Sequence, residues 1–141
     1  MEFYGRDGRS LNEYWADRPS AYLGITVPGF PNLFMMYGPS THLNHGGSLI
    51  FHSECQMRYI GAALDVLADK GAKAMEPRPE LYEEYHARHQ AEISQLVWNS
   101  PAIKHTHFRN DAGEIHTVSP FRLVDYWDWT RTVDPDDFVY S

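Results

Sequence analysis

The stretch FPNLFMMYGPSTHLNHGGSLIFHSECQ, residues 30–56, decides the fold that we expect. Its apolar part, Asn32 to Tyr37, has the length and bulk of a buried strand. Gly38-Pro39 breaks the run, small and polar residues follow, and Gly46-Gly47-Ser48 precedes a helical pattern. A strand, a glycine-containing loop and a helix start in this order can form a ligand site from main-chain atoms. A plain turn has the same pattern, so both interpretations stay open.

A helix is expected from Ser48 to about Lys70, because apolar residues recur there at helical spacing and Gly71 supplies a stop. Its predicted inner stripe comprises Ile50, Met57, Ile60, Leu64 and Leu67. Glu54 and Gly61 fall on the same stripe. We expect the glycine to allow close packing, and the carboxylate to bind a neighbouring backbone group. The first amides of this helix carry partial positive charge and can hold an anion or the electron-rich edge of a cofactor ring.

Shorter elements are expected on both sides of this stretch. Ser10 and Glu13 fit a capping box for a helix over residues 11–17. A second long helix should begin at Pro79 and run to about Val97. Its predicted inner face comprises Tyr82, Tyr85, His89, Ile93 and Leu96.

The C-terminal part predicts a hairpin and one more helix. Residues 104–119 read as a hairpin with its turn at 110–113, and residues 120–134 as a short aromatic helix followed by an acidic tail. We therefore predict an α+β fold for the isolated chain, as one domain over residues 1–141. It has too few strands for a complete sheet of its own.

Composition and charge exclude several classes of protein. The 141 residues carry a net charge of −7 with few basic residues, which argues against nucleic-acid and anionic-membrane surfaces. No apolar segment approaches the roughly 20 residues that span a bilayer. No export signal is readable at the N-terminus, so a cytoplasmic protein is expected. The single cysteine, Cys55, excludes an intrachain disulfide.

Other candidate chemistry has simpler explanations. The eight histidines fall mostly in pairs, each on a different element, whereas zinc needs three or four converging ligands. No metal site is therefore predicted, and His86 and His89 should face inward and bond to a carbonyl or carboxylate. Cys55 is expected to be a buried bystander rather than a nucleophile. The tyrosine and tryptophans at 126–129 should form a packed cap.

Longer motifs resemble one family. The strings GRDGRSLNEYW (5–15), AYLGITVPGFPNLFMMYGPST (21–41) and GGSLIFHSECQMRYI (46–60) resemble the C-terminal third of flavin-dependent Baeyer–Villiger-type monooxygenases. The hydroxyacetophenone monooxygenase branch is the most similar. The resemblance continues more loosely through HFRNDAGEI (107–115) and SPFRLVDYWDWTR (119–131), so it covers nearly the whole chain.

The resemblance implies a fold, cofactors and a substrate class. Family members are α/β flavoproteins with two dinucleotide-binding domains, FAD held tightly and NADPH as reductant. They insert oxygen next to a ketone carbonyl or oxidise a soft heteroatom. Residues 1–70 would close the FAD domain, and residues 71–141 would form a helical and hairpin extension.

Site residues follow from the same resemblance. Gly38, Pro39 and Ser40 would shape a loop beside the flavin ring. The amides around Gly47, Ser48 and Leu49 would face the pyrimidine edge of the flavin, where negative charge develops. Asn44 and His45 would line the substrate pocket, and no catalytic residue is assigned.

The sequence also departs from the family pattern in two places that bear on function. No two of the ten glycines form G-x-G, so the phosphate-binding turn for either dinucleotide is absent from this sequence. The late motif, usually Trp-Tyr-x-Asn, reads His107-Phe108-Arg109-Asn110, which puts the nicotinamide and substrate role of that tryptophan in doubt. We therefore expect a piece of such an enzyme, either a truncated reading frame or an excised domain.

Three functional hypotheses result. The first is the C-terminal portion of an FAD- and NADPH-dependent monooxygenase, inactive and free of cofactor when isolated, with uncovered apolar faces that favour self-association. The second is a stand-alone, non-catalytic α+β module that dimerises or binds a planar ligand. The third is a histidine-based metalloprotein.

Overall fold

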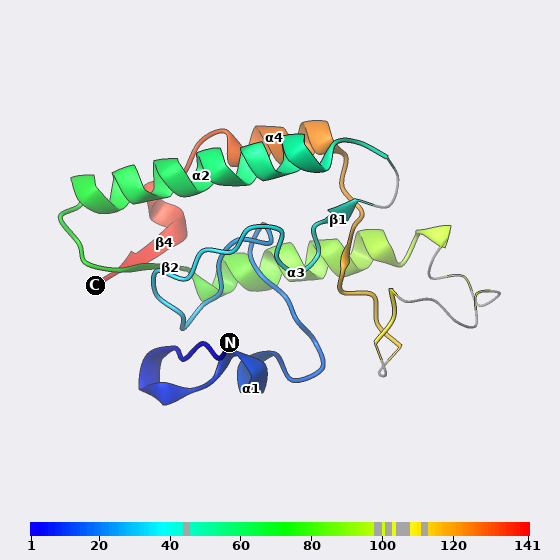
Figure 1. Ribbon diagram of the computed structural model, residues 1–141, viewed down its shortest axis with the longest axis horizontal. Coiled ribbons are helices and arrows are strands. Elements are labelled where there is room, and N and C mark those ends of the chain that lie inside the picture. Colours follow the sequence, from blue (N-terminus) through cyan, green and yellow to red (C-terminus); the bar gives the residue numbers. More distant parts are fainter. Residues whose placement is uncertain (44–45, 98–99, 101–102, 104–107, 111–112) are drawn as a thin grey trace.

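The computed structural model describes residues 1–141 except 44–45, 98–99, 101–102, 104–107 and 111–112. Two long helices dominate the chain, α2 (Leu49–Asp69) and α3 (Pro79–Ile93). The irregular segment 20–41 runs between them, and the short helices η1 (Arg6–Gly8) and α1 (Leu11–Trp15) lie below it (Figure 1). Helix α4 (Leu123–Thr130) packs against α2.

The described strands form two separate pairs. β1 (His42–Leu43) lies parallel to β3 (Val118–Ser119). β2 (Met75–Pro77) lies antiparallel to β4 (Phe138–Tyr140), which follows the 3-10 turn η3 (Pro135–Asp137). The fold is therefore α+β with very little sheet, as expected. The acidic tail was not predicted to pair with β2.

The strand predicted over residues 32–37 is wrong. Asn32 and Tyr37 have φ values of +58° and +55°, which a strand cannot accommodate. The Asn32 side chain instead accepts a hydrogen bond from Met75 N at 3.1 Å and donates one to Lys73 O at 3.0 Å. Met36 and Tyr37 are exposed rather than buried. The segment is an irregular connection fixed by such individual bonds.

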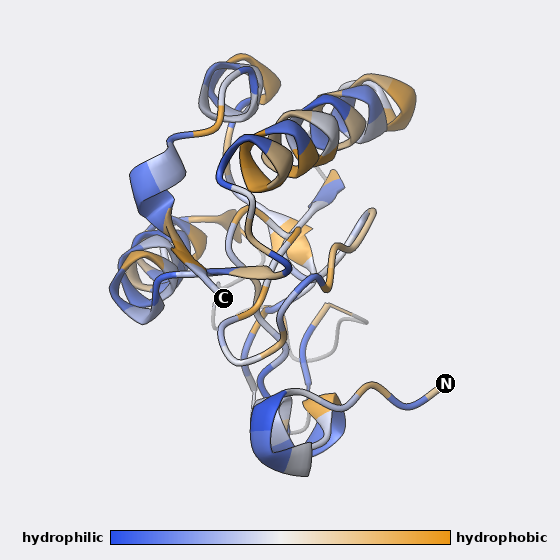
Figure 2. Ribbon diagram, turned by 90° about the vertical axis from the view of Figure 1, so that its left-hand side faces the viewer, coloured by the Kyte–Doolittle hydropathy of each residue, from blue (hydrophilic) through white to orange (hydrophobic). Residues whose placement is uncertain are grey.

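Helix α2 forms where it was predicted, but it buries another face. Ser48 caps it by accepting a hydrogen bond from Phe51 N, and Gly71 ends it with φ +62°. The buried residues are His52, Cys55, Gln56, Tyr59 and Ala63. Of the predicted inner stripe, only Ile60 and Leu67 pack against the core. Figure 2 shows both hydrophobic and hydrophilic residues along α2.

Polar bonding explains the wrong prediction of the α2 face. Gln56 accepts from Tyr37 N and donates to the Tyr126 hydroxyl, so this amide is stabilised inside, while Ile50, Met57 and Leu64 stay exposed. Glu54 is also exposed and does not bind a neighbouring backbone group among the described residues.

The other predicted elements form with small changes. The Ser10–Glu13 capping box is present and α1 ends at Trp15. Helix α3 begins with Pro79 but ends at Ile93, four residues earlier than expected, and buries Tyr82, His89 and Ile93. An antiparallel bridge joins Arg109 to Ile115, as in the predicted hairpin, whose turn falls partly outside the described residues.

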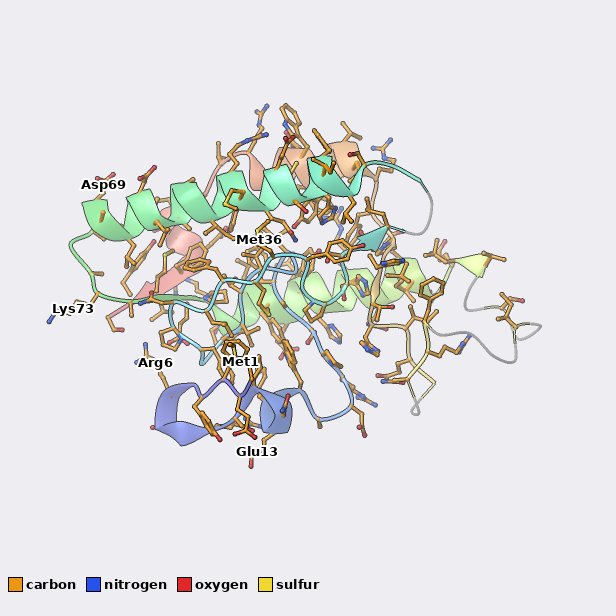
Figure 3. The ribbon with its side chains drawn as sticks, viewed as in Figure 1. Met1, Arg6, Glu13, Met36, Asp69 and Lys73 are labelled. Atoms are coloured by element: carbon orange, nitrogen blue, oxygen red, sulfur yellow. The ribbon has the colours of Figure 1, made fainter. Side chains whose placement is uncertain are left out.

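The main core joins both halves of the chain. It combines residues from the irregular segment, α2, β2, α4 and β4: Leu23, Ile25, Cys55, Tyr59, Ala63, Met75, Tyr126 and Phe138. Glu76 of β2 pairs with Arg6 Nε at 2.6 Å and accepts from Gly29 N, which ties the N-terminal segment to this core. In Figure 3, Arg6 points from η1 toward the β2–β4 pair. Across the described ranges, no helix is long and apolar enough to cross a membrane.

Candidate flavin-edge and substrate site

The loop that follows Tyr37 is held by close backbone packing. A Cβ atom at Gly38 would lie 2.4 Å from Gly24 O, so only glycine fits there. Thr41 Oγ1 donates to Gly38 O at 2.6 Å and closes the turn around Pro39. Ser40 adopts φ +66°, an uncommon value for a residue other than glycine. These contacts give the loop one defined shape.

The loop is also fixed to the segment that precedes α4. Ser40 donates from N and from Oγ to His116 O, at 2.9 and 3.2 Å. His42 N donates to Thr117 O at 2.9 Å, beside the parallel β1–β3 pair. Ser40 is buried, and its hydroxyl is committed to this contact. It therefore helps to fix the shape of the loop and does not present a free hydroxyl to a ligand, and its predicted place beside a flavin stays a prediction.

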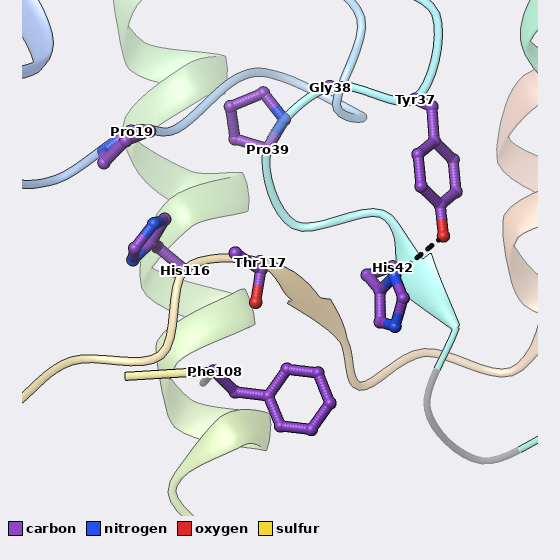
Figure 4. A pocket seen from close by; sticks show the side chains of 8 residues that line it. All are labelled: Pro19, Tyr37, Gly38, Pro39, His42, Phe108, His116 and Thr117. Atoms are coloured by element: carbon purple, nitrogen blue, oxygen red, sulfur yellow. Dashed lines mark hydrogen bonds between the residues drawn. The ribbon is translucent and has the colours of Figure 1, made fainter. Parts of the chain in front are cut away.

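A cavity of about 410 Å³ lies between the loop and this segment (Figure 4). Its lining is mostly apolar and comprises Pro19, Tyr37, Gly38, Pro39, His42, Phe108, His116 and Thr117. The Tyr37 hydroxyl lies 3.0 Å from His42 Nδ1. The His42 ring lies 5.7 Å from that of Phe108. The cavity thus combines ring faces with hydrogen-bonding groups, as small-molecule sites do.

Two residues that line the cavity each have a buried polar atom without a hydrogen-bond partner among the described residues. His116 Nδ1 and Thr117 Oγ1 are buried and form no hydrogen bond within the described part of the chain. Buried polar atoms are normally paired, and each unpaired one needs an explanation. Because both atoms are fully buried, they are not hydrogen-bonding groups that the cavity presents to a ligand.

The start of α2 forms a second part of the site. Gly47 has φ +118°, and a Cβ atom there would lie 2.4 Å from Leu123 Cδ1 of α4. Because Gly47 has no side chain, the start of α2 can lie this close to Leu123. Ser48 caps the helix there, and Leu49 is half exposed. Gly47, Ser48 and Leu49 do not line the cavity that Gly38 and Pro39 line. Asn44 and His45 lie outside the described residues.

A buried polar layer supports the loop from behind. Gln56 Oε1 accepts from Tyr37 N at 2.8 Å, and Gln56 Nε2 donates to the Tyr126 hydroxyl at 3.1 Å. Tyr126 in turn donates to Leu23 O at 2.6 Å. His52 stacks on Tyr126 with ring centroids 4.0 Å apart, and burial lowers the pKa of His52 to about 4. This imidazole is therefore neutral at pH 7.

Other candidate groups are structural. His89 Nε2 lies 2.8 Å from Val118 O, and burial lowers its pKa to about 4, which confirms the predicted inward position. Cys55 is fully buried, and burial raises the pKa of its thiol, so it is not an activated nucleophile. In the described ranges, no three His, Cys, Asp or Glu side chains converge as a metal site. His45, His105 and His107 lie outside those ranges.

Comparison with known proteins identifies the fold family. No family model matches the chain. An uncharacterized monooxygenase of Sinorhizobium fredii is 42% identical over 98% of this chain and 21% of its own length. An FAD-binding monooxygenase of Aspergillus niger is 36% identical over 99% of this chain and 23% of its own length. A Baeyer-Villiger monooxygenase of Pseudomonas aeruginosa is 33% identical over 83% of this chain and 22% of its own length.

A solved structure agrees with these relatives. An oxidized steroid monooxygenase bound to NADP superposes with a TM-score of 0.79 and 25% identity, over 99% of this chain and 26% of that protein. The chain belongs to the Baeyer–Villiger-type flavin monooxygenases. It corresponds to their C-terminal part and spans only a fifth to a quarter of the length of these relatives. The complete family fold is an α/β flavoprotein with two dinucleotide-binding domains, as the resemblance implied.

Sequence reasoning missed most of the cavity lining within this monooxygenase segment. Tyr37 was assigned to a strand, and His42 was considered only as a metal ligand. His116 and Thr117 carried no motif, because their role depends on the parallel pairing of β1 with β3. The available signal was Phe108, which lies in the late family motif and contributes a ring to the wall.

Proposed function

We propose that this chain is the C-terminal portion of an FAD- and NADPH-dependent monooxygenase that inserts oxygen into ketones or oxidises heteroatoms. It supplies the loop beside the flavin ring and one wall of the substrate pocket. The observation that carries this proposal is the cavity of about 410 Å³ bounded by the Gly38-Pro39 loop. Relatives named as FAD-binding and bound to NADP support the choice of cofactors.

The residues present fit one edge of a flavin. Because Gly38 has no side chain, the loop can lie close to the backbone at Gly24, and Pro39 lines the cavity. The first turn of α2 presents backbone amides and the positive end of the helix dipole. In this proposal, the amides around Gly47, Ser48 and Leu49 stabilise negative charge on the ring edge. When bound, FAD supplies the activated oxygen for the reaction.

The cavity side chains bind and orient the substrate in this proposal. The mostly apolar walls exclude water around the carbon skeleton of a ketone or sulfide. The Tyr37 hydroxyl and His42 Nδ1 share a hydrogen bond of 3.0 Å, whose direction depends on the tautomer of the imidazole. In the tautomer with its proton on Nε2, His42 can donate a hydrogen bond to a substrate oxygen. Asn44 and His45 remain proposed lining residues from the sequence.

The isolated chain should not hold FAD. No phosphate-binding G-x-G-x-x-G turn is present in the sequence, and each 1.4 kcal/mol of lost binding energy lowers affinity about tenfold. The test is to incubate the purified chain with FAD, desalt it and record a visible spectrum. We expect no retained flavin absorbance and no ketone-dependent oxidation of NADPH. Retained flavin at one equivalent per chain would contradict the proposal that other walls are required.

We also propose that copies of the isolated chain associate with one another. Exposed apolar side chains on α2 and the loop favour contacts between copies of the isolated chain. We expect its apparent mass to rise with concentration in sedimentation velocity, and a clean monomer at all concentrations would contradict this. The cytoplasmic location expected from the sequence remains a prediction.

A further inference from the structure

A second cavity, of about 260 Å³, is lined by residues of α3, α4 and the irregular segment. Aromatic and aliphatic side chains form part of its wall, among them Tyr22, Leu81 and Trp129, and two charged residues of α3, Glu84 and Arg88, also line it. Among the described residues, it shares no lining residue with the 410 Å³ cavity. Ligand pockets usually enclose about 300–1,000 Å³, so this cavity suits a molecule with one small ring.

Arg88 is held at this cavity by aromatic rings and not by an acidic partner. Its guanidinium carbon lies 4.5 Å from the centre of the Trp129 ring and 5.5 Å from that of Phe121. In the described part of the chain it forms no ion pair, and the carboxylate of Asp125 binds Arg122 instead, at 2.7 and 2.8 Å. A guanidinium stacked on a ring keeps its N–H edge available for a carboxylate, which it can bind through two parallel hydrogen bonds.

Glu84 lies about one helical turn before Arg88 and lines the same cavity. A glutamate four residues before an arginine is well placed to pair with it on a helix, yet these two side chains form no ion pair. They therefore present opposite charges to one cavity. An anion would be repelled by Glu84 and a cation by Arg88, whereas a molecule that carries both charges can pair with both residues.

The aromatic part of the wall consists of rings that pack against one another. Tyr22 and Tyr85, which both line the cavity, meet edge to face with ring centroids 5.6 Å apart. Trp129 meets Phe121 in the same way, with centroids 5.0 Å apart. These contacts restrain the rings before a ligand binds, which lowers the entropic cost of binding. The apolar body of a ligand can therefore lie against surfaces that are already in place.

We propose that this cavity binds a small zwitterion, an α-amino acid with an aromatic or bulky aliphatic side chain. The carboxylate of the ligand pairs with Arg88, and its ammonium group pairs with Glu84. The apolar side chain of the ligand lies against Tyr22, Tyr85 and Trp129. This inference does not rest on the proposed flavin site, because the two cavities have separate linings among the described residues.

The test uses three probes that share a phenyl ring and differ in their charged groups. Free phenylalanine carries both charges, phenylpropionate lacks the ammonium group, and phenylethylamine lacks the carboxylate. Each probe is titrated into the 141-residue chain, and calorimetry gives its Kd. We expect phenylalanine to bind in the millimolar range or tighter, and about tenfold more tightly than either other probe, because each loses one charged contact. Equal affinity for phenylalanine and either other probe would overturn the proposal, as would a lack of millimolar binding by phenylalanine.

Two substitutions at exposed positions separate the two charged contacts. Arg88→Gln should weaken phenylalanine binding about tenfold and should not weaken phenylethylamine binding. Glu84→Gln should weaken phenylalanine binding and should strengthen phenylpropionate binding, because it removes a repulsive charge. Arg88→Lys keeps the charge without the planar fork, so its affinity should fall between those of Arg88 and Arg88→Gln. Weaker phenylpropionate binding in Glu84→Gln would contradict the assigned pairing.

The matched control for Arg88→Gln is Arg131→Gln. Arg131 lies 5.2 Å from the centre of another α4 tryptophan ring, that of Trp127, and neither residue lines the cavity. We expect this variant to bind all three probes as the unsubstituted chain does. Phenylalanine should also raise the melting temperature of the unsubstituted chain and of Arg131→Gln, but not that of Arg88→Gln. Equal losses of affinity in the two arginine variants would overturn the proposal, because they would show a general effect of charge.

Discussion

At the scale of single residues, Gly38 fixes the loop on which the candidate site depends. Its Cα faces Gly24 O so closely that a Cβ atom would lie 2.4 Å away. Gly38→Ala should lower the free energy of unfolding by about 1–3 kcal/mol, the usual cost of overpacking. Gly61→Ala is the matched control and should stabilise the chain by up to about 1 kcal/mol, since the added methyl meets no atom. Both changes are measured by urea unfolding, and equal effects would contradict the described loop packing.

Two buried histidines make the stability of the chain sensitive to acid. Burial lowers the pKa values of His52 and His89 from the ordinary value of 6.5 to about 4. The unfolded chain therefore binds these protons first as the pH falls. Their contribution to stability is complete above pH 6.5 and is lost as the pH falls toward 4, on the order of 3 kcal/mol for each histidine.

A variant at His52 isolates its part of this effect. His52→Phe keeps a ring stacked on Tyr126 but cannot take up a proton. We expect the unfolding free energy of this variant to fall less steeply between pH 6.5 and pH 4 than that of the unsubstituted chain. An unchanged slope, measured by urea unfolding at several pH values, would show that His52 is not buried in its neutral form.

At the scale of elements, the C-terminal strand β4 is more important than its acidic sequence suggests. Phe138 is 1% exposed in the main core, whereas its neighbour Val139 is 40% exposed. Phe138→Ala should destabilise the chain by about 3–5 kcal/mol, and Val139→Ala should cost much less. Thermal unfolding monitored by circular dichroism checks both. Similar losses for the two variants would contradict the pairing of β4 with β2.

The sequence predicts helices here better than strands, for a physical reason. Periodicity, the Ser10–Glu13 capping box and Gly71 are local signals, and all four predicted helices form, with α1, α3 and α4 shorter than predicted. The strands are only two or three residues long and pair across long separations, so no local period marks them. The inner face of α2 was misjudged because buried Gln56 and His52 satisfy tertiary contacts that hydrophobicity does not encode.

The candidate site was predictable only in part, because some of its residues carry local sequence signals and others meet only through long-range pairing. Gly38 and Pro39 attracted attention because a glycine-proline break is visible in the sequence. Both line the cavity, and their contact with a flavin stays a prediction. His42 and His116 meet there only through the pairing of β1 with β3, which residue patterns do not reveal.

At the scale of the whole molecule, the chain has a core of its own but also an apolar surface that no described part of the chain covers. The core joins α2, α4, β2 and β4, whereas Met36 and three apolar residues of α2, Ile50, Met57 and Leu64, remain exposed. A segment that spans about a fifth to a quarter of the length of its relatives is expected to have both a core of its own and an uncovered apolar surface. Under the proposed function, the remaining flavin contacts are therefore expected to lie outside these 141 residues.

The proposed role is tested most directly with a chimera in which the 139 matching residues of the Sinorhizobium fredii relative are replaced by this chain. After desalting, we expect about one FAD per chimera and none in the 141-residue chain alone. We also expect loss of flavin when Gly47→Leu is introduced into the chimera, because φ +118° at this position disfavours any side chain and the added atoms would collide with Leu123, so that the start of α2 would shift. A folded chimera without flavin, or one that keeps its flavin with Gly47→Leu, would contradict the proposal that the start of α2 lies at the flavin edge.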